Sequence, residues 1–261
     1  MAAKESPGKT IAVAFVLCLV CSIIVSSAAI FLKPMQVKNQ IIDVKKNILM
    51  VSGLIDDGGI SASEVEDKFA SVTPVVVNLA TGEVNSDIDA SSYDQKKAAK
   101  DTSLNEVIPA EKDRARIKMR AKNALVYLVK KEGVTDQLIL PVHGKGLWST
   151  MYGFLALDKD GSTVRGLTFY QHGETPGLGG EIDNPSWKKQ WPGKQVFGPS
   201  GDVQLGLIKG LVDNSRPEAK YQIDGLSGAT LTSNGVTEMV KYWLGTEGFG
   251  KFIKNFKNGG V

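Results

Sequence analysis

The sequence begins with a long apolar stretch that few kinds of structure can accommodate. Ile11–Leu32 is uncharged and runs for about 22 residues, long enough for a helix to cross the hydrocarbon core of a bilayer. Lys9 and Lys33 bracket the run. A cleaved signal peptide is the alternative, and Ser26–Ala28 would be a poor cleavage site for it. Because the apolar run continues to Leu32, which a cleaved signal would not need, the pattern favours an uncleaved anchor.

The anchor divides the chain into four parts. We predict a tail over residues 1–10, a transmembrane helix over 11–32, juxtamembrane helices with an insertion over 33–120, and the main domain over 121–261. Lysines lie on both sides of the anchor. Large domains cross membranes regardless of such charge counts, so the charges do not decide on which side the main domain lies.

The composition argues against several classes of function. The net charge is +3, with no basic face and no interleaving of basic and aromatic residues, which argues against nucleic-acid binding. Cys18 and Cys21 both lie in the apolar run, so the rest of the chain lacks the thiolates of an iron–sulfur cluster. Two thiols spaced i, i+3 on a membrane helix are more often packing residues than a redox pair. His143 and His172 are the only histidines, and their spacing does not indicate a metal site.

The middle and C-terminal parts of the sequence predict successive hairpins rather than alternating strands and helices. Apolar strand candidates follow one another through turns such as Asp158–Ser162. This succession is typical of an α+β domain, here an antiparallel sheet flanked by helices and preceded by the single transmembrane helix. An amphipathic helix is expected over Gln36–Val51 and a further one in the tail from Phe249. The strand candidates are Val75–Val77, Ala124–Lys130, Gln137–Val142, Leu147–Leu157 and Thr163–Tyr170, with Val203–Leu211 and Tyr221–Ile223 as further candidates.

A hydroxyl-rich decapeptide, Asp224–Ser233, lies directly before a well-defined helix. Over Val236–Leu244 the apolar residues recur at i, i+3, i+4, i+7 and i+8, which predicts one buried helical stripe ending at Gly245. The start of a helix presents unpaired N–H groups and the positive end of its dipole, which favour an anion. Small residues in the decapeptide let a phosphate approach the backbone closely. The alternative is that Thr232 or Ser233 only caps the helix.

A glycine-rich segment, Glu174–Glu181, follows the predicted hairpins. Its glycines allow the backbone to approach a planar ligand, and Trp148 upstream could stack on an aromatic ring. An ordinary loop over a core tryptophan explains the same residues equally well. Neither G-x-G sequence completes a G-x-G-x-x-G fingerprint and no Walker A sequence is present, so nothing indicates a dinucleotide site on this chain. His172 near Glu174 lacks a nucleophile at a recognisable spacing, which argues against a hydrolase.

The decapeptide resembles the flavinylation motif of the FMN-binding domain family. Asp224–Thr230 agrees with that motif, in which the last threonine carries FMN through a phosphoester bond. The resemblance therefore implies covalent FMN on Thr230, in an accessible loop of Ser227, Gly228 and Ala229 that a separate FMN transferase modifies by using FAD. The family also has a Glu-Thr-Pro-Gly-Leu-Gly loop near the isoalloxazine. By this resemblance the residues near the flavin ring are Leu147, Trp148, Glu174, Thr175, Leu178 and Gly179.

Across nearly its whole length the chain resembles the C subunits of sodium-translocating NADH:quinone oxidoreductases. The anchor, the segment Asn47–Leu49 and the two flavin motifs occur in the order found in that family. The resemblance implies a single-span flavoprotein subunit of a bacterial inner-membrane complex, with residues 1–10 in the cytoplasm and the flavin domain in the periplasm. It implies electron transfer through FMN toward ubiquinone. NADH, sodium and quinone would be bound by partner subunits, and this chain would hold no metal and no catalytic residue.

Two alternatives remain open from the sequence. The related G subunit of the ion-pumping ferredoxin:NAD oxidoreductase shares the flavin motif but is shorter. The insertion around Ser71–Lys112, together with Asn47–Leu49, favours the C subunit. The other alternative is a membrane-anchored scaffold domain that holds no flavin.

Overall fold

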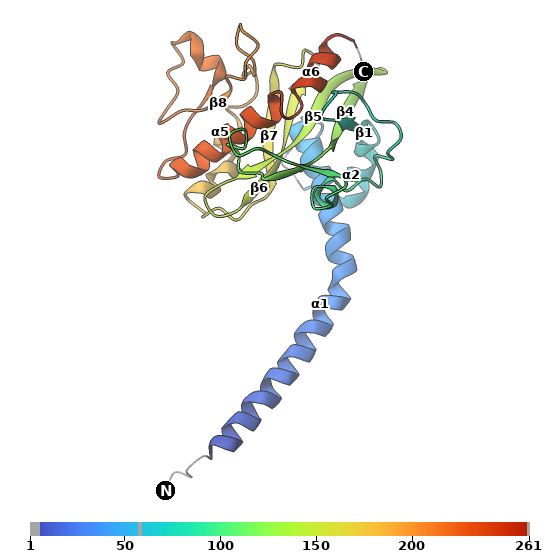
Figure 1. Cartoon of the computed structure of the whole chain (residues 1–261), viewed down its shortest axis with the longest axis vertical. Coiled ribbons are helices and arrows are strands. Elements are labelled where there is room, and N and C mark those ends of the chain that lie inside the picture. The colour runs from blue at the N-terminus through green and yellow to red at the C-terminus, as the bar shows by residue number, and fades with distance from the viewer. Residues whose placement is uncertain (1–5, 57–58, 260–261) are drawn as a thin grey trace. The chain divides into compact units, whose positions relative to one another are not determined.

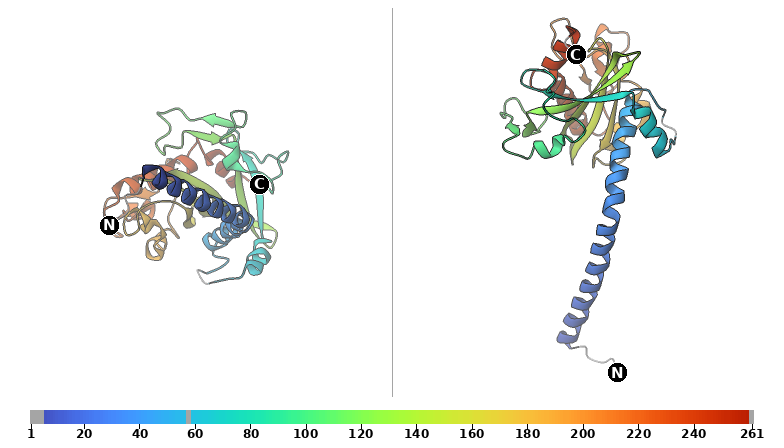
Figure 2. Two further views of the ribbon diagram at one scale, coloured as in Figure 1. Left: turned by 90° about the horizontal axis from the view of Figure 1, so that it is seen from below. Right: turned by 90° about the vertical axis from the view of Figure 1, so that its right-hand side faces the viewer.

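The computed structural model describes residues 6–56 and 59–259. The chain forms two compact units, Met1–Val44 and Lys45–Val261. One helix, α1 (Pro7–Val51), runs from the first unit into the second and is drawn as one continuous ribbon in Figure 2. Among the described residues, α1 is the one helix long and apolar enough to cross a membrane, with a mean hydropathy of 2.7 over an 18-residue window. Its length and composition suit a single-pass anchor.

The expectation of a separate helix beginning at Gln36 is wrong, because α1 continues through Pro34. Proline lacks the N–H that would bond to the carbonyl four residues earlier, so it removes one hydrogen bond of the helix. The backbone hydrogen bonds of the helical residues on both sides of Pro34 stabilise α1 by more than this one lost bond destabilises it. The last turns of α1 belong to the second unit, where Ile48 and Leu49 are fully buried. There the Thr168 hydroxyl donates a hydrogen bond to Asn47 Oδ1 at 3.3 Å.

Five antiparallel strands form the central sheet of the second unit, in the order β1-β4-β5-β6-β7 (Figure 1). Strands β4 to β7 follow one another as hairpins, as the sequence predicts, and β1 pairs with β4 at the edge. Leu138, Ile139 and Leu140 are successive residues of β5 with no exposed surface, so both faces of the sheet are covered. The predicted α+β class is confirmed. The strands are β1 (Val72–Asn78), β4 (Asn123–Lys131), β5 (Val134–Lys145), β6 (Thr150–Asp158) and β7 (Val164–Gln171).

The predicted helix after the decapeptide is α5 (Thr230–Leu244), which packs along β5. Gly235 faces the Lys145 carbonyl so closely that a Cβ there would lie 2.4 Å from its oxygen. Near the other end of α5, the indole N–H of Trp243 donates to the His143 carbonyl at 2.7 Å. These contacts fix the first turn of α5 at the end of the sheet where β5 finishes.

The remaining elements are short. The tail helix is confirmed, and its Phe252 and Ile253 are buried. The strands expected over Val203–Leu211 and Tyr221–Ile223 reduce to a two-residue parallel pair, β8 with β9. These elements are α2 (Ala62–Phe69), α3 (Gln95–Ala98), β2 (Asn105–Val107), β3 (Met119–Ala121), η1 (Gly179–Asp183), α4 (Pro185–Lys188), β8 (Gly206–Leu207), η2 (Pro217–Tyr221), β9 (Gln222–Ile223) and α6 (Gly250–Lys257).

Candidate functional site

A single buried carboxylate joins three segments at one end of the sheet. Glu174 lies in the loop after β7 and is 5% exposed. Its Oε1 accepts the backbone N–H groups of Trp148 at 3.0 Å and Ser149 at 3.1 Å. Its Oε2 accepts the N–H of Leu147 at 3.0 Å and the hydroxyl of Thr232 at 2.6 Å. The β5–β6 loop, the loop after β7 and the first turn of α5 therefore meet at this side chain.

The surroundings of Glu174 keep its carboxyl group ionised. Burial alone would raise its pKa, but hydrogen bonds from the Thr232 hydroxyl and from the β5–β6 loop outweigh burial and lower the pKa below 4.5. Two glycines make room for the carboxylate. A Cβ on Gly146 would lie 2.6 Å from Oε1, and one on Gly179 would lie 2.9 Å from Oε2. The backbone at both positions can therefore carry no side chain without moving the carboxylate.

The same three segments present apolar side chains to solvent. Trp148 is 67% exposed and Leu231 is 53% exposed, and Leu147 and Leu178 are each more than 40% exposed. Leu178 also borders the decapeptide, because a Cβ on Gly228 would lie 3.0 Å from its Cδ2. Several large apolar side chains that are exposed near one another indicate a surface that binds a ligand or a partner. An aromatic side chain among them suits a planar ring.

The decapeptide forms a tight turn into α5. The Ser233 hydroxyl accepts the N–H of Leu226 at 3.0 Å and donates to the Ala229 carbonyl at 3.1 Å. The capping hypothesis for Thr232 or Ser233 is wrong, because the N-cap is Ala229 and no side chain accepts a hydrogen bond there. Thr232 instead donates to the central carboxylate, and Ser233 holds the turn together.

The first turn of α5 is open to an anion. Within residues 6–56 and 59–259, no acceptor receives the N–H groups of Thr230, Leu231 and Thr232. The first turn also carries no acidic residue, and Thr230 is exposed. Free N–H groups and the positive end of the helix dipole stabilise a phosphate there by about 0.3–1 kcal/mol. These residues fit a phosphate group held at the Thr230 hydroxyl.

The structure brings the ten residues that the sequence indicated into one region. Sequence reasoning missed Ser149 and Leu231 and gave Thr232 a different role. No local signal could have found Ser149, because its backbone N–H and its hydroxyl both bond to residues of the loop after β7, at Glu174 and Gly173. The exposed members of the predicted set are Leu147, Trp148, Thr175, Leu178, Ser227, Gly228 and Thr230, and the buried ones are Glu174, Gly179 and Ala229.

Both histidines make contacts with other groups of the protein that support the fold. The Nε2 of His172 lies 2.6 Å from Asp183 Oδ2, and its Nδ1 accepts the backbone N–H of Glu174 at 3.2 Å. His172 therefore holds the backbone of the loop and does not pair with the Glu174 carboxylate. His143 stacks on Tyr152 with ring centroids 5.4 Å apart, and burial lowers its pKa to about 4.

Comparison with known proteins agrees with this geometry. Residues 146–245 match the family model described as FMN-binding domain. The C subunit of the Na(+)-translocating NADH-quinone reductase of Pseudomonas aeruginosa is 49% identical over 260 residues, which cover 99% of both chains. The corresponding C subunit of Vibrio vulnificus is 45% identical over 262 residues, with all of both chains covered.

Solved structures of C subunits share the fold. The crystal structure of NqrC from Shewanella oneidensis has a TM-score of 0.75 at 36% identity, covering 83% of this chain and 97% of that chain. The C subunit of the Na(+)-translocating NADH-quinone reductase of Parabacteroides distasonis has a TM-score of 0.63 at 30% identity, covering 85% of this chain and 96% of that one. The chain therefore belongs to the family of Na(+)-translocating NADH-quinone reductase C subunits, with an FMN-binding domain.

Proposed function

We propose that this protein carries electrons through FMN attached by a phosphoester to the Thr230 hydroxyl. The observation that carries the proposal is the exposed Thr230 side chain at the start of α5, beside three backbone N–H groups without an acceptor in the described chain. FMN supplies the redox chemistry when it is bound, passing electrons between the iron–sulfur and flavin centres of the complex toward quinone. The protein itself holds and tunes the flavin, and NADH binds elsewhere in the complex.

Different residues of the site hold the phosphate and cover the flavin ring. The N–H groups of the first turn of α5 stabilise the negative charge that a phosphodiester retains. The exposed side chains of Trp148, Leu178 and Leu231 exclude water from one side of a planar ring. Glu174 does not reach the ring in this account, and it instead fixes the segments that carry those side chains. A covalent link makes retention of the cofactor independent of binding affinity, which is useful where free FMN would diffuse away.

Attachment needs an FMN transferase that uses FAD. A bond forms between Thr230 Oγ and the phosphorus of the FMN half, while the pyrophosphate bond of FAD breaks. AMP leaves, and the hydroxyl proton goes to solvent. The exposure of Ser227, Gly228 and Thr230 leaves the acceptor accessible to such an enzyme.

The proposal predicts that Thr230→Ala abolishes covalent flavin and leaves the domain folded, because the exposed side chain makes no packing contact that the fold needs. Thr230→Ser keeps the hydroxyl and should retain part of the flavin. The measurement is ultraviolet fluorescence of the denatured protein on a gel, followed by peptide mass spectrometry across Tyr221–Lys241. The protein should be produced in a host that makes the transferase.

Ser227→Ala is the matched control, because Ser227 is the other exposed hydroxyl of the loop and should not be needed. Thr232 and Ser233 are buried and hydrogen-bonded, so they are poor acceptors. Covalent FMN on Thr230→Ala would show that the acceptor is wrong, with Ser227 the next candidate. A wild-type protein without fluorescence would favour the scaffold alternative. The relatives named above are all C subunits, which favours that interpretation over the G subunit.

We also propose that α1 anchors the protein in a bacterial inner membrane with the flavin domain in the periplasm. In a Cys18→Ser/Cys21→Ser background, Lys131→Cys places one thiol at an exposed turn of the domain. In cells with a permeabilised outer membrane, a membrane-impermeant maleimide should label Lys131→Cys. The matched variant Ser6→Cys, before the anchor, should stay unlabelled until the inner membrane is broken. The reverse pattern would place the domain in the cytoplasm.

A further inference from the structure

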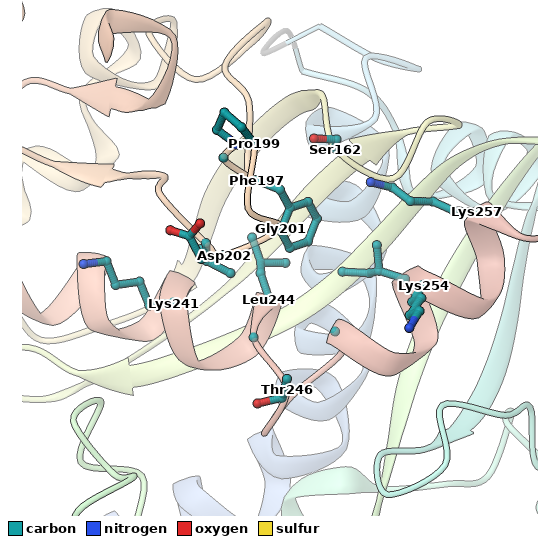
Figure 3. A pocket seen from close by; sticks show the side chains of 15 residues that line it. Ser162, Phe197, Pro199, Gly201, Asp202, Lys241, Leu244, Thr246, Lys254 and Lys257 are labelled. Carbon is teal, nitrogen blue, oxygen red and sulfur yellow. The ribbon is translucent and has the colours of Figure 1, made fainter.

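Away from the candidate flavin site, a recess lies at the opposite end of α5 from Thr230. It has a volume of about 900 Å³, within the range of ligand-sized clefts, and the side chains that line it are drawn in Figure 3. The end of α5, one side of α6, the loop before β8 and Ser162 in the turn after β6 form its walls. Its floor contains the apolar side chains Leu244, Ile253, Phe197 and Val203, and its rim carries Lys241, Lys254 and Lys257.

The charges of the rim are strongly unbalanced. Among the lining residues, the three lysines are matched by one carboxylate, Asp202, which already accepts a hydrogen bond from the Ser200 hydroxyl. Lys257 also interacts electrostatically with Asp160 in the turn after β6, so Lys241 and Lys254 carry the excess positive charge. In the part of the chain that the structure describes, none of the three ammonium groups has a carboxylate within 4.0 Å. Lys257 Nζ lies 4.8 Å from the centroid of the Phe197 ring. Positive charge around an apolar floor is the complement of a ligand that is acidic outside and apolar at its centre.

The dimensions favour a peptide segment over a small ion. A carboxylate or phosphate would occupy a small part of 900 Å³ and would leave the apolar floor in contact with water. A short segment with one large apolar side chain and flanking Asp or Glu residues would cover the floor and pair with the lysines. A member of a multi-subunit complex has neighbouring chains that can supply such a segment.

We propose that this lysine-rimmed recess is a docking site for an acidic segment of another subunit of the same complex. The apolar anchor of that segment would lie on Leu244 and Ile253, and its carboxylates would pair with Lys241, Lys254 and Lys257. The site lies one helix length away from Thr230, so the proposal does not depend on the flavin.

Zero-length carbodiimide cross-linking of the intact, detergent-solubilised complex tests the contact directly. The reagent joins a lysine amine to a carboxylate that touches it. We expect cross-linked peptides between Lys241, Lys254 or Lys257 and Asp or Glu residues of one other protein of the complex. Cross-links from these lysines that reach only Asp202 or Asp160 of the same chain, or none at all, would overturn the proposal.

Charge reversal tests what the contact contributes. Lys241→Glu/Lys254→Glu should lower the amount of the other subunits that co-purify with this one by about tenfold at low salt. The matched control Lys100→Glu/Lys131→Glu changes the net charge equally at exposed sites outside the recess and should change nothing. Equal retention by both variants would contradict the proposal.

A third variant separates charge from shape. Thr246→Trp adds bulk at an exposed position of the rim without changing charge, and it should also reduce co-purification. Circular dichroism and flavin fluorescence of each variant show whether the domain is still folded and loaded. Loss of partner subunits with normal flavin supports docking, whereas loss of flavin with normal partner retention concerns Thr230 and contradicts docking at the recess.

Discussion

The carboxyl group of Glu174 is buried and still ionised, because it accepts several hydrogen bonds. Five donors from two other segments surround its oxygens, so the charge is stabilised where burial alone would neutralise it. Replacing the carboxylate would take an acceptor away from these donors, and for the buried Thr232 hydroxyl this costs more than the hydrogen bond itself contributes. Glu174 is therefore the residue on which the arrangement of the candidate flavin site most depends.

Glu174→Gln should lower the free energy of unfolding by about 2 kcal/mol or more, because the amide N–H₂ faces donors rather than acceptors. The pKa of Glu174 is lowered in the folded state, so its contribution is fully present above pH 4.5 and is lost as the pH falls through the lower folded-state pKa. Urea unfolding of both proteins between pH 8 and pH 3 measures this. The difference between them should be constant above pH 4.5 and shrink below it.

A difference that stays constant down to pH 3 would show that the charge of Glu174 contributes nothing. Glu181→Gln is a suitable control, because within the described residues the Glu181 carboxylate accepts one side-chain hydrogen bond, from the Asn184 amide. It should change the free energy of unfolding by much less.

At the scale of single residues, the sequence predicts Thr230 as the acceptor hydroxyl, which stays a prediction, but it did not indicate which residue joins the segments of the site. The motif places Thr230 because its neighbours in sequence are also its neighbours in space. Glu174 and Thr232 lie 58 residues apart, and no local pattern shows that their side chains meet. The resemblance assigns Glu174 to the flavin site, which stays a prediction, and the structure adds that its carboxylate accepts hydrogen bonds from two other segments.

Among the elements, α5 connects the two sites of the molecule. Its first turn carries Thr230, and its last turn carries Lys241 and Leu244 at the lysine-rimmed recess. Its position is fixed by its close approach to β5, where Gly235 leaves no room for a side chain beside the Lys145 carbonyl. A glycine in the interior of a helix is explained here by packing rather than by flexibility.

Gly235→Ala should therefore destabilise the domain, although alanine is the better helix former by about 1 kcal/mol. A Cβ at that position would lie 2.4 Å from the Lys145 oxygen, so either α5 or β5 must move. We expect a loss of about 1–3 kcal/mol in the free energy of unfolding, measured by thermal unfolding followed by circular dichroism.

Asn234→Ala is the control, because Asn234 is the exposed neighbour in the same helix. It should be neutral or slightly stabilising. If both alanine variants gained stability, the close approach of α5 to β5 would be wrong.

The sequence predicted those elements whose pattern is local. The hairpin strands alternate or run apolar between turn signals, and α5 has a clear apolar stripe. Strands β8 and β9 were overestimated because each pairs over only two residues, with a segment distant in sequence. The continuity of α1 was missed because Pro34 is a strong signal for a break, and one lost hydrogen bond did not end so long a helix.

At the scale of the whole molecule, the boundary of the folded unit falls inside α1. The second unit begins at Lys45, so the last turns of the anchor helix are part of its core. Ile48 and Leu49 have no exposed surface, and Val51 has 7%. A boundary drawn where the apolar run ends does not coincide with the boundary of the fold.

A soluble fragment Lys45–Val261 should fold, and one beginning at Ser52 should be less stable by several kcal/mol. Each buried aliphatic side chain that is lost contributes about 1.5–3 kcal/mol, and whole domains have only about 5–15 kcal/mol. Urea unfolding of the two fragments measures the difference. Identical midpoints would show that the end of α1 is dispensable for the fold.

The way in which one carboxylate gathers segments from three places bears on protein engineering. On the proposal made above, Asp224–Ser233 copied into a foreign protein would act as a short acceptor tag for a flavin. A flavin attached to this tag would move freely in water, because the residues proposed to contact its ring lie outside the tag. An engineer who wants a defined orientation, and hence a tuned colour or potential, would have to transplant the acid and its two partner loops as well.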